Sequence, residues 1–169
     1  MTSVNGLPAH ILLVHAIVVL LPLAALLLVL TAVWPAARRR LAGSNAILAV
    51  FVVVLVPITT SAGEWLERRV PSSTLLHDHT ELGDTAIFYA IPVAVLAVVI
   101  WWRSREAAAS ATRHTYLAPL SVTVTRIVAA LAIAAAGTGV YGMYRIGDSG
   151  SKAAWTGNFS STASQQEPG

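Results

Sequence analysis

The sequence predicts an all-α protein, an integral membrane bundle of four transmembrane helices. Of its 169 residues, 56% are hydrophobic and only 11% are charged, and the mean hydropathy is +0.68. Water-soluble domains of this size do not have that balance. The hydrophobic residues form long uncharged stretches, each able to cross a hydrocarbon layer of about 30 Å. These stretches are apolar on every side and do not alternate, so a closed barrel of strands does not fit.

The first two expected spans cover about residues 9–35 and 42–66. No charged residue occurs from Thr2 to Ala37, or from Leu41 to Gly63. No Lys or Arg precedes the first span, so the basic segment of a cleaved signal peptide is missing. We therefore expect the first span to be retained in the membrane.

The third expected span covers about residues 74–102. Pro71 precedes it, and Ser72 or Ser73 can cap its first turn, because a serine oxygen accepts a backbone N–H at that position. Each of the first three spans also contains a proline, which removes one backbone hydrogen bond and permits a kink; these prolines are Pro22, Pro57 and Pro92.

The fourth expected span covers about residues 118–145, with Arg126 its one charged residue before the outer end. Its second half is rich in alanine and glycine, which lets a helix or a flat cofactor approach closely, and we favour helix packing. We interpret Gly147–Gly150 as a helix C-cap and turn. Residues 151–169, rich in Ser, Thr and Gln, are expected to form a polar extracytoplasmic tail.

The basic residues predict the orientation of the bundle. On one side, six of them lie near span ends beside a single acid, Glu106; they are Arg38, Arg39, Arg40, Arg103, Arg105 and Arg113. By the positive-inside rule that side should be cytoplasmic, which places both termini outside. Arginine is far more frequent than lysine and alanine is abundant, which favours a bacterial source and hence the plasma (inner) membrane.

The composition also excludes several classes of site. The chain has no cysteine, which excludes disulfides, iron–sulfur clusters, covalent c-type haem and thiolate zinc sites. Its net charge of +3 is explained by membrane orientation, so we expect no nucleic-acid partner. No GxSxG, P-loop or HExxH motif occurs. We therefore expect a binding or redox subunit more than an enzyme.

Ionisable and polar residues gather at the outer ends of all four spans. An ionisable group at membrane depth is costly unless it is paired, hydrated or bound to a metal, so this layer is the candidate site. Its members are His10 and His15 from the first span, Thr59, Thr60, Ser61 and Glu64 from the second, His77, Asp78, His79, Glu81 and Asp84 from the third, and Tyr141, Met143, Tyr144, Arg145 and Asp148 from the fourth.

The leading hypothesis is a b-type haem held between His15 and His79, with a role in electron transfer. Counted from the expected helix starts, these two histidines lie at the same depth on parallel helices, about 10 Å in. Neutral imidazoles are good axial ligands, and a helical bundle can hold a flat apolar ring. Small residues near His79 would leave space for the macrocycle, and Glu64, Tyr141 or Arg145 could contact the propionates; the small residues are Gly83, Ala86 and Ala90.

Two alternatives remain open. The first is a copper or zinc site, since neutral imidazole suits both ions; its candidate ligands are His10, His15, His77 and His79, with Met143 as a further candidate. His77 aligns with Glu81 and Asp84, so that face favours a hydrated cluster or a hard metal. The second alternative is a structural or assembly subunit with no cofactor, whose polar layer serves packing against a partner in a larger membrane complex.

A transporter is less favoured, because one copy offers no internal repeat and no charged residue near the middle of the bilayer. A homodimer could supply the missing half. The lipid bilayer is the one partner that the composition itself requires.

Four segments, in order along the chain, resemble a bacterial four-helix membrane family, domain of unknown function 2231; they are Leu7–His15, Ala62–Glu67, His79–Asp84 and Arg145–Trp155. Many relatives carry Val-His-Phe-Pro in the first helix. Here the five-residue histidine spacing is kept, but Ala16 and Ile17 replace Phe-Pro. In some relatives the domain is joined to a Rieske or cytochrome c domain, which implies an association with electron transfer.

Overall fold

The computed structural model describes residues 3–4, 6–109 and 116–159. Its helices are α1 (Ala9–Val33), α2 (Pro35–Glu67), α3 (Thr74–Asp84), α4 (Ala86–Ala109) and α5 (Val122–Trp155). Two short strands, β1 (Ser3–Val4) and β2 (Leu7–Pro8), pair antiparallel just before α1. Arg113 of the expected cytoplasmic loop and residues 160–169 of the expected tail lie outside the described residues.

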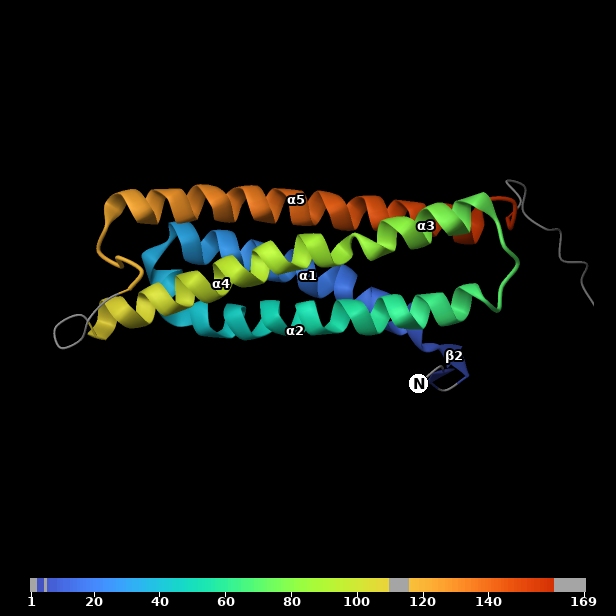
Figure 1. Cartoon of the computed structure of the whole chain (residues 1–169), viewed down its shortest axis with the longest axis horizontal. Coiled ribbons are helices and arrows are strands. Elements are labelled where there is room, and N and C mark those ends of the chain that lie inside the picture. Colours follow the sequence, from blue (N-terminus) through green and yellow to red (C-terminus); the bar gives the residue numbers. More distant parts are fainter. Residues whose placement is uncertain (1–2, 5, 110–115, 160–169) are drawn as a thin grey trace, which may run out of the picture.

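The helices form an up-and-down bundle (Figure 1), in which α3 and α4 together make the third crossing. Within the described residues, four helical stretches are long and apolar enough to cross a membrane: Ala9–Val33, Pro35–Glu67, Thr74–Ala109 and Val122–Trp155. The predicted all-α bundle of four membrane-spanning helices is confirmed. We call the end that holds the α1–α2 junction the basic end, and the opposite end, where α1 begins and α5 ends, the histidine end.

The junction between α1 and α2 is shorter than expected. Only Trp34 separates the two helices, in an extended conformation. Pro35 explains this, because the ring of a proline pushes the preceding residue out of the helical region while favouring the first position of a new helix. Arg38, Arg39 and Arg40 therefore lie on α2 itself and not in a loop.

The third crossing begins as expected and then contains a break that we did not expect. Ser73 is the N-cap of α3, where its hydroxyl oxygen accepts the N–H of Leu76 at 3.2 Å. Thr85 then separates α3 from α4, and its hydroxyl donates to the carbonyl of Leu82 at 2.6 Å. Threonine side chains compete in this way with the helical backbone. The break lets α3 lean towards α5, as Figure 1 shows.

The last helix is longer than expected at its C-terminal end. It begins after Ser121, whose oxygen accepts the N–H of Val124, and continues through Gly147–Gly150 to Trp155. The expected turn at Gly147–Gly150 is therefore wrong. An ion pair four residues apart, with Lys152 Nζ 2.7 Å from Asp148 Oδ2, joins two turns of the extension and is the kind of pair that supports an exposed helix.

Small side chains fill the centre of the bundle. Buried alanines line all four crossings, among them Ala24, Ala49, Ala97 and Ala132. This is typical of membrane helices, where close packing takes the place of hydrophobic burial. The fully buried Asn45 adds a polar link. With its amide oxygen and nitrogen assigned from their hydrogen-bond partners, the nitrogen donates to the carbonyl of Ala24 at 3.2 Å and the oxygen accepts the N–H of Leu28 at 3.1 Å.

Gly139 and Gly142 of α5 serve helix packing against α4, as we favoured. A Cβ atom at Gly142 would lie 2.5 Å from the ring of Tyr89, which reaches across from α4. Ala86 and Ala90 are likewise buried in the core. Ala86 and Ala90, two of the three small residues expected beside a macrocycle, thus pack against other helices and leave no space for one. At the remaining position, Gly83, no atom lies within 4 Å of an added Cβ.

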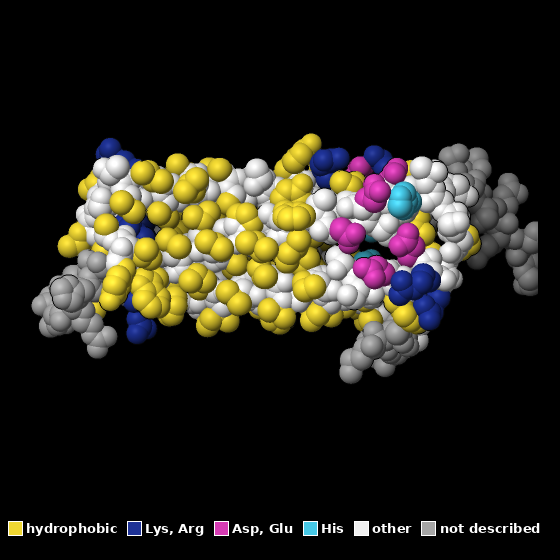
Figure 2. Space-filling view, in the orientation of Figure 1, with side chains coloured by type: hydrophobic (Ala, Val, Ile, Leu, Met, Phe, Trp, Pro, Cys, Tyr) yellow, Lys and Arg dark blue, Asp and Glu magenta, His cyan; other side chains and the backbone are white. Residues whose placement is uncertain are grey.

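The outer surface has two chemically distinct parts (Figure 2). Apolar side chains cover most of its length and include exposed Val19, Ile47, Phe88 and Leu131. At the histidine end, acidic, basic and histidine side chains replace them, and Figure 2 shows acidic groups around a hollow there. The apolar part suits lipid contact, while the histidine end suits water or a partner.

Candidate functional site

His10 lies in the first turn of α1 and contacts α2. Its Nδ1 is 2.9 Å from the backbone carbonyl oxygen of Thr59. A carbonyl can only accept, so Nδ1 carries the proton and donates, and the lone pair is left on Nε2. The side chain of Thr59 is tied down as well, because its hydroxyl donates to the carbonyl of Leu55 at 2.9 Å.

The His10 ring fits against α2 because residue 63 is glycine. A Cβ atom there would lie 2.9 Å from ring atoms Cε1 and Nδ1, a distance that real side chains do not adopt. Gly63 therefore gives the imidazole its place on the helix backbone. This contact also explains how His10 is half-buried although it lies near the end of its helix.

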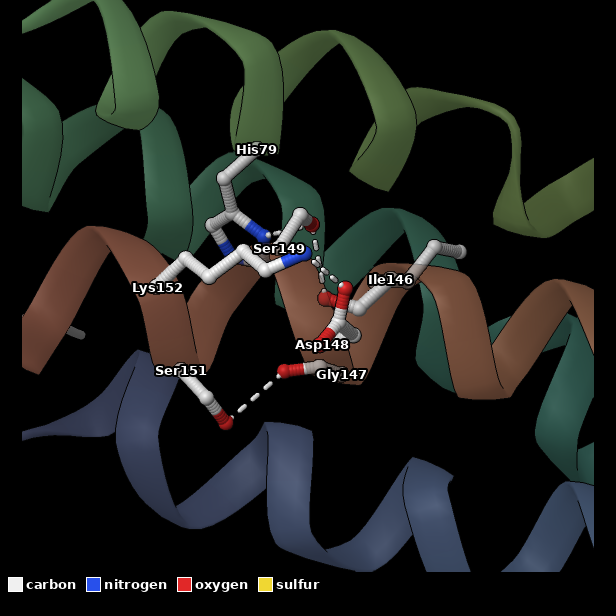
Figure 3. Close-up of polar contacts among 7 residues, drawn as sticks. All are labelled: His79, Ile146, Gly147, Asp148, Ser149, Ser151 and Lys152. Carbon is white, nitrogen blue, oxygen red and sulfur yellow. Dashed lines mark hydrogen bonds and ion pairs between the residues drawn. The ribbon is translucent and has the colours of Figure 1, made fainter.

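His79 on α3 makes an equivalent arrangement with α5 (Figure 3). Its Nδ1 is 3.0 Å from Ser149 Oγ, and the Ser149 hydroxyl donates its own proton to the carbonyl of Ile146 at 2.9 Å. Oγ is therefore left to accept, so His79 Nδ1 donates and Nε2 again keeps its lone pair. A Cβ at Gly150 would lie 2.9 Å from His79 Cε1.

The two rings meet inside the histidine end. The ring centres of His10 and His79 are 6.5 Å apart, and the ring planes are inclined by 70°. Two metal–nitrogen bonds of about 2 Å, added to the distance from each nitrogen to its ring centre, would place two rings on opposite sides of one ion about 6 Å apart. We call His10 and His79 the histidine pair. The observed spacing of 6.5 Å is close to that opposed arrangement.

The groups around the histidine pair are polar but spread out. Thr80 Oγ1 approaches Glu67 Oε1 at 3.4 Å and links α3 to α2. His77 Nε2 lies 3.3 Å from Glu81 Oε1, with both side chains about two-thirds exposed. Among the described residues, no group of three or more His, Asp or Glu side chains is placed to hold a metal ion. The histidine pair therefore offers two candidate protein ligands and no third within the described part of the chain.

The expected partner of His79 needs correction, because His10 and not His15 contacts it. His15 is exposed, and its Nδ1 donates to the carbonyl of Ile11 in its own helix at 2.6 Å. Five residues rotate a helical side chain by about 140°, so His10 and His15 lie on different faces of α1. His15 and His79 were expected at the same depth, but depth along a helix does not determine which face a side chain occupies.

Most of the other expected site residues are exposed. Tyr141, Arg145 and Glu64 are exposed, and His77 is turned by about 200° from His79 along α3, as expected from its alignment with Glu81. Met143 is buried in the core. Among the expected haem and metal ligands, His10 and His79 are the two whose rings the structure brings together.

Three of the residues that hold the rings in place were not expected at the site: Gly63, Ser149 and Gly150. Ser149 and Gly150 were expected in a turn, and no role was expected for Gly63. A usable signal was present, since a glycine in the interior of an exposed polar helix lowers helix stability and needs a packing reason. Ser149 could be found only once α5 was known to continue beyond Gly147.

The comparison with protein families agrees with this architecture. Residues 6–163 match the family described as "Predicted membrane protein (DUF2231)". The chain belongs to this family. The match to DUF2231 covers nearly all the described residues, including the histidine pair and both of its glycines. No curated protein and no solved structure matches the chain significantly.

Proposed function

We propose that this DUF2231 protein is a membrane protein that binds one copper ion between His10 and His79 and uses it for electron transfer. The observation that supports the proposal is the orientation of the two imidazole rings and the tautomer that their hydrogen bonds impose. Each commits Nδ1 to an acceptor inside the bundle, Thr59 or Ser149, and each keeps Nε2 for another partner. Histidines that ligate metals almost always donate their second nitrogen in this way, which fixes the ring and its tautomer.

Copper fits this pair better than zinc. Structural zinc sites are closed by four protein ligands, and catalytic ones by three, whereas the histidine pair offers two. Copper(II) binds a given set of nitrogen ligands more tightly than the other divalent first-row metals. Two well-oriented imidazoles therefore favour copper, with water or a neighbouring carboxylate completing the coordination.

A b-type haem is the alternative occupant, and the packing favours a compact ion over it. The rings already touch helix backbone at Gly63 and Gly150. A macrocycle between the rings needs a flat space as wide as several side chains, and it would have to separate α1 and α3 from α2 and α5. A single ion needs far less space between the two rings.

Electron transfer suits a site whose ligands are held rigidly. Each imidazole is held by a hydrogen bond at Nδ1 and by close contact with a glycine. A ligand set that hardly moves supports a metal in two oxidation states with little rearrangement. The site also lies at the polar end of the bundle, where a redox partner could approach it without entering the apolar region.

Titration of the purified protein with copper, in detergent, tests the proposal. We expect one copper ion per chain by elemental analysis, a copper(II) signal by electron paramagnetic resonance, and a reversible reduction. His10→Ala and His79→Ala should each weaken binding by at least about tenfold, since each removes one of two ligands. His15→Ala and His77→Ala are the matched controls and should bind as the unaltered chain does.

The other outcomes separate the alternatives. A Soret band after incubation with haem, lost in His79→Ala, would replace copper by haem. Stoichiometric zinc with no copper would leave a metal site but remove electron transfer. If neither metal nor haem binds, and both variants still assemble with a co-purifying partner, the polar layer is structural and the proposal is wrong.

A further inference from the structure

Two arginines line one cavity at the basic end, far from the histidine pair. The cavity has a volume of about 60 Å³ and lies where α1, α2, α4 and α5 meet. Arg38 reaches it from α2 and Arg103 from α4, and Ser104 and Thr125 add hydroxyl groups to its wall. Arg103 is buried, with 7% of its surface exposed. Buried arginine is uncommon in proteins unless a partner compensates its charge.

Each guanidinium is partly used by the fold. Arg38 Nε donates to the carbonyl of Thr31 at 2.8 Å, and its Nη2 donates to that of Ala32. These carbonyls belong to the last turn of α1, where backbone C=O groups have no hydrogen-bond donor within the helix. Arg103 donates to the carbonyls of Leu117 and Pro119 and to Thr125 Oγ1. A guanidinium has five N–H groups, so both arginines keep donors for a further ligand.

The positive charge at the cavity is only partly compensated. Glu106 attracts Arg103, but its carboxylate oxygens accept from Trp102 Nε1 and from the backbone N–H groups of Tyr116 and Leu117, each at 2.9 Å. In the part of the chain that the structure describes, neither Arg38 nor Arg103 forms an ion pair. An anion in the cavity would neutralise the two guanidinium groups and accept their remaining hydrogens.

Exposed aromatic side chains set the level of this cavity in the membrane. Trp34, Trp102 and Tyr116 lie at the basic end and expose 58%, 47% and 82% of their surfaces. Trp and Tyr concentrate at the headgroup level of a bilayer. The two arginines therefore lie at the depth of lipid phosphates.

We propose that Arg38 and Arg103 bind a phosphate group in this cavity. Arginine forks match the geometry of phosphate oxygens, so the two guanidinium groups supply the recognition. The hydroxyl groups of Ser104 and Thr125 line the wall but donate to the carbonyls of Trp101 and Ser121. The same chemistry can come from the headgroup of an anionic phospholipid or from free inorganic phosphate. Either ligand would tie α1 and α2 to α4 and α5 through a single group.

Thermal unfolding of the purified full chain in an uncharged detergent tests this proposal. Unfolding is compared in inorganic phosphate, in sodium chloride of equal ionic strength, and with short-chain phosphatidylglycerol. We expect phosphate, phosphatidylglycerol or both to raise Tm by about 3 °C or more over chloride. Arg38→Gln and Arg103→Gln should abolish the rise. Arg39→Gln, an exposed neighbour with the same change of charge, should retain it.

Two further measurements keep the result interpretable. Circular dichroism reports whether each variant is folded; if the glutamine variants are not, Arg38→Lys keeps the charge without the fork and should weaken phosphate binding about tenfold by calorimetry. A rise with phosphatidylglycerol alone identifies a lipid site, and a rise with phosphate alone identifies a site for the free ion. No rise in the unaltered chain, or an equal rise in Arg38→Gln, overturns the proposal.

Discussion

Gly150 and Gly147 lie one turn apart on α5, yet they have different surroundings. A Cβ at Gly150 would lie 2.9 Å from the His79 ring, whereas one at Gly147 would have no atom within 4 Å. In a helix, Gly→Ala adds up to about 1 kcal/mol of stability where space is free. We expect Gly147→Ala to raise the free energy of unfolding by up to that amount. Gly150→Ala should lower it, because the added methyl group overpacks against the His79 ring, which costs about 1–3 kcal/mol.

Chemical unfolding of the two variants in detergent measures the difference. Gly150→Ala should also displace the His79 ring and weaken copper binding about tenfold if the histidine pair is the metal site. Gly63→Ala should act in the same way on His10. Equal stability of Gly147→Ala and Gly150→Ala would mean that His79 does not lie against α5 in solution.

At the scale of single residues, the sequence predicted that His10 and His79 belong to the site, but it did not predict that they contact each other. It placed His10 and His79 in one polar layer, because each lies near the expected start of its helix. It could not pair them, because the face that a side chain occupies depends on the exact helix start and on how each helix is rotated against its neighbours. The five-residue step from His10 to His15 already implied different faces and was the one signal that could have excluded His15.

At the scale of the helices, Asn45 joins the two halves of the first helical hairpin. Its buried amide bonds to the backbone of α1 at both Ala24 and Leu28. Hydrogen bonds between helices in membrane proteins contribute about 0.6–2 kcal/mol. We therefore expect Asn45→Ala to destabilise the protein by about 1–2 kcal/mol in unfolding by sodium dodecyl sulfate. Ser44→Ala, at an exposed neighbour, should change stability little, and a similar loss in both variants would contradict this role.

Helix existence was predictable, but several helix boundaries were not. Long uncharged stretches require helices in lipid, since every backbone group must be paired internally. Boundaries depend on local competition that hydropathy does not report. Because of Pro35, the connection between α1 and α2 consists of Trp34 alone, and Thr85 divides the third crossing into α3 and α4. Residues 151–155 have the composition of a tail but extend α5, because adjacent helical turns and the Asp148–Lys152 pair support them.

At the scale of the whole molecule, the two ends differ in charge, and this predicts how the bundle lies in the membrane. The basic end carries Arg38, Arg39, Arg40, Arg103 and Arg105, and the histidine end carries most of the acidic residues. Positively charged segments are retained in the cytoplasm during insertion. We therefore expect the histidine pair to face outward and the cavity at Arg38 and Arg103 to face the cytoplasmic leaflet.

The absence of cysteine makes this orientation simple to measure, because any introduced cysteine is unique in the chain. Tyr116 at the basic end and Ser72 at the histidine end are both exposed, so Tyr116→Cys and Ser72→Cys should leave the packing intact. In intact cells, a membrane-impermeant maleimide should label Ser72→Cys and not Tyr116→Cys, while permeabilised cells should label both. The reverse pattern would invert the bundle, and it would place the histidine pair in contact with cytoplasmic and not extracytoplasmic redox partners.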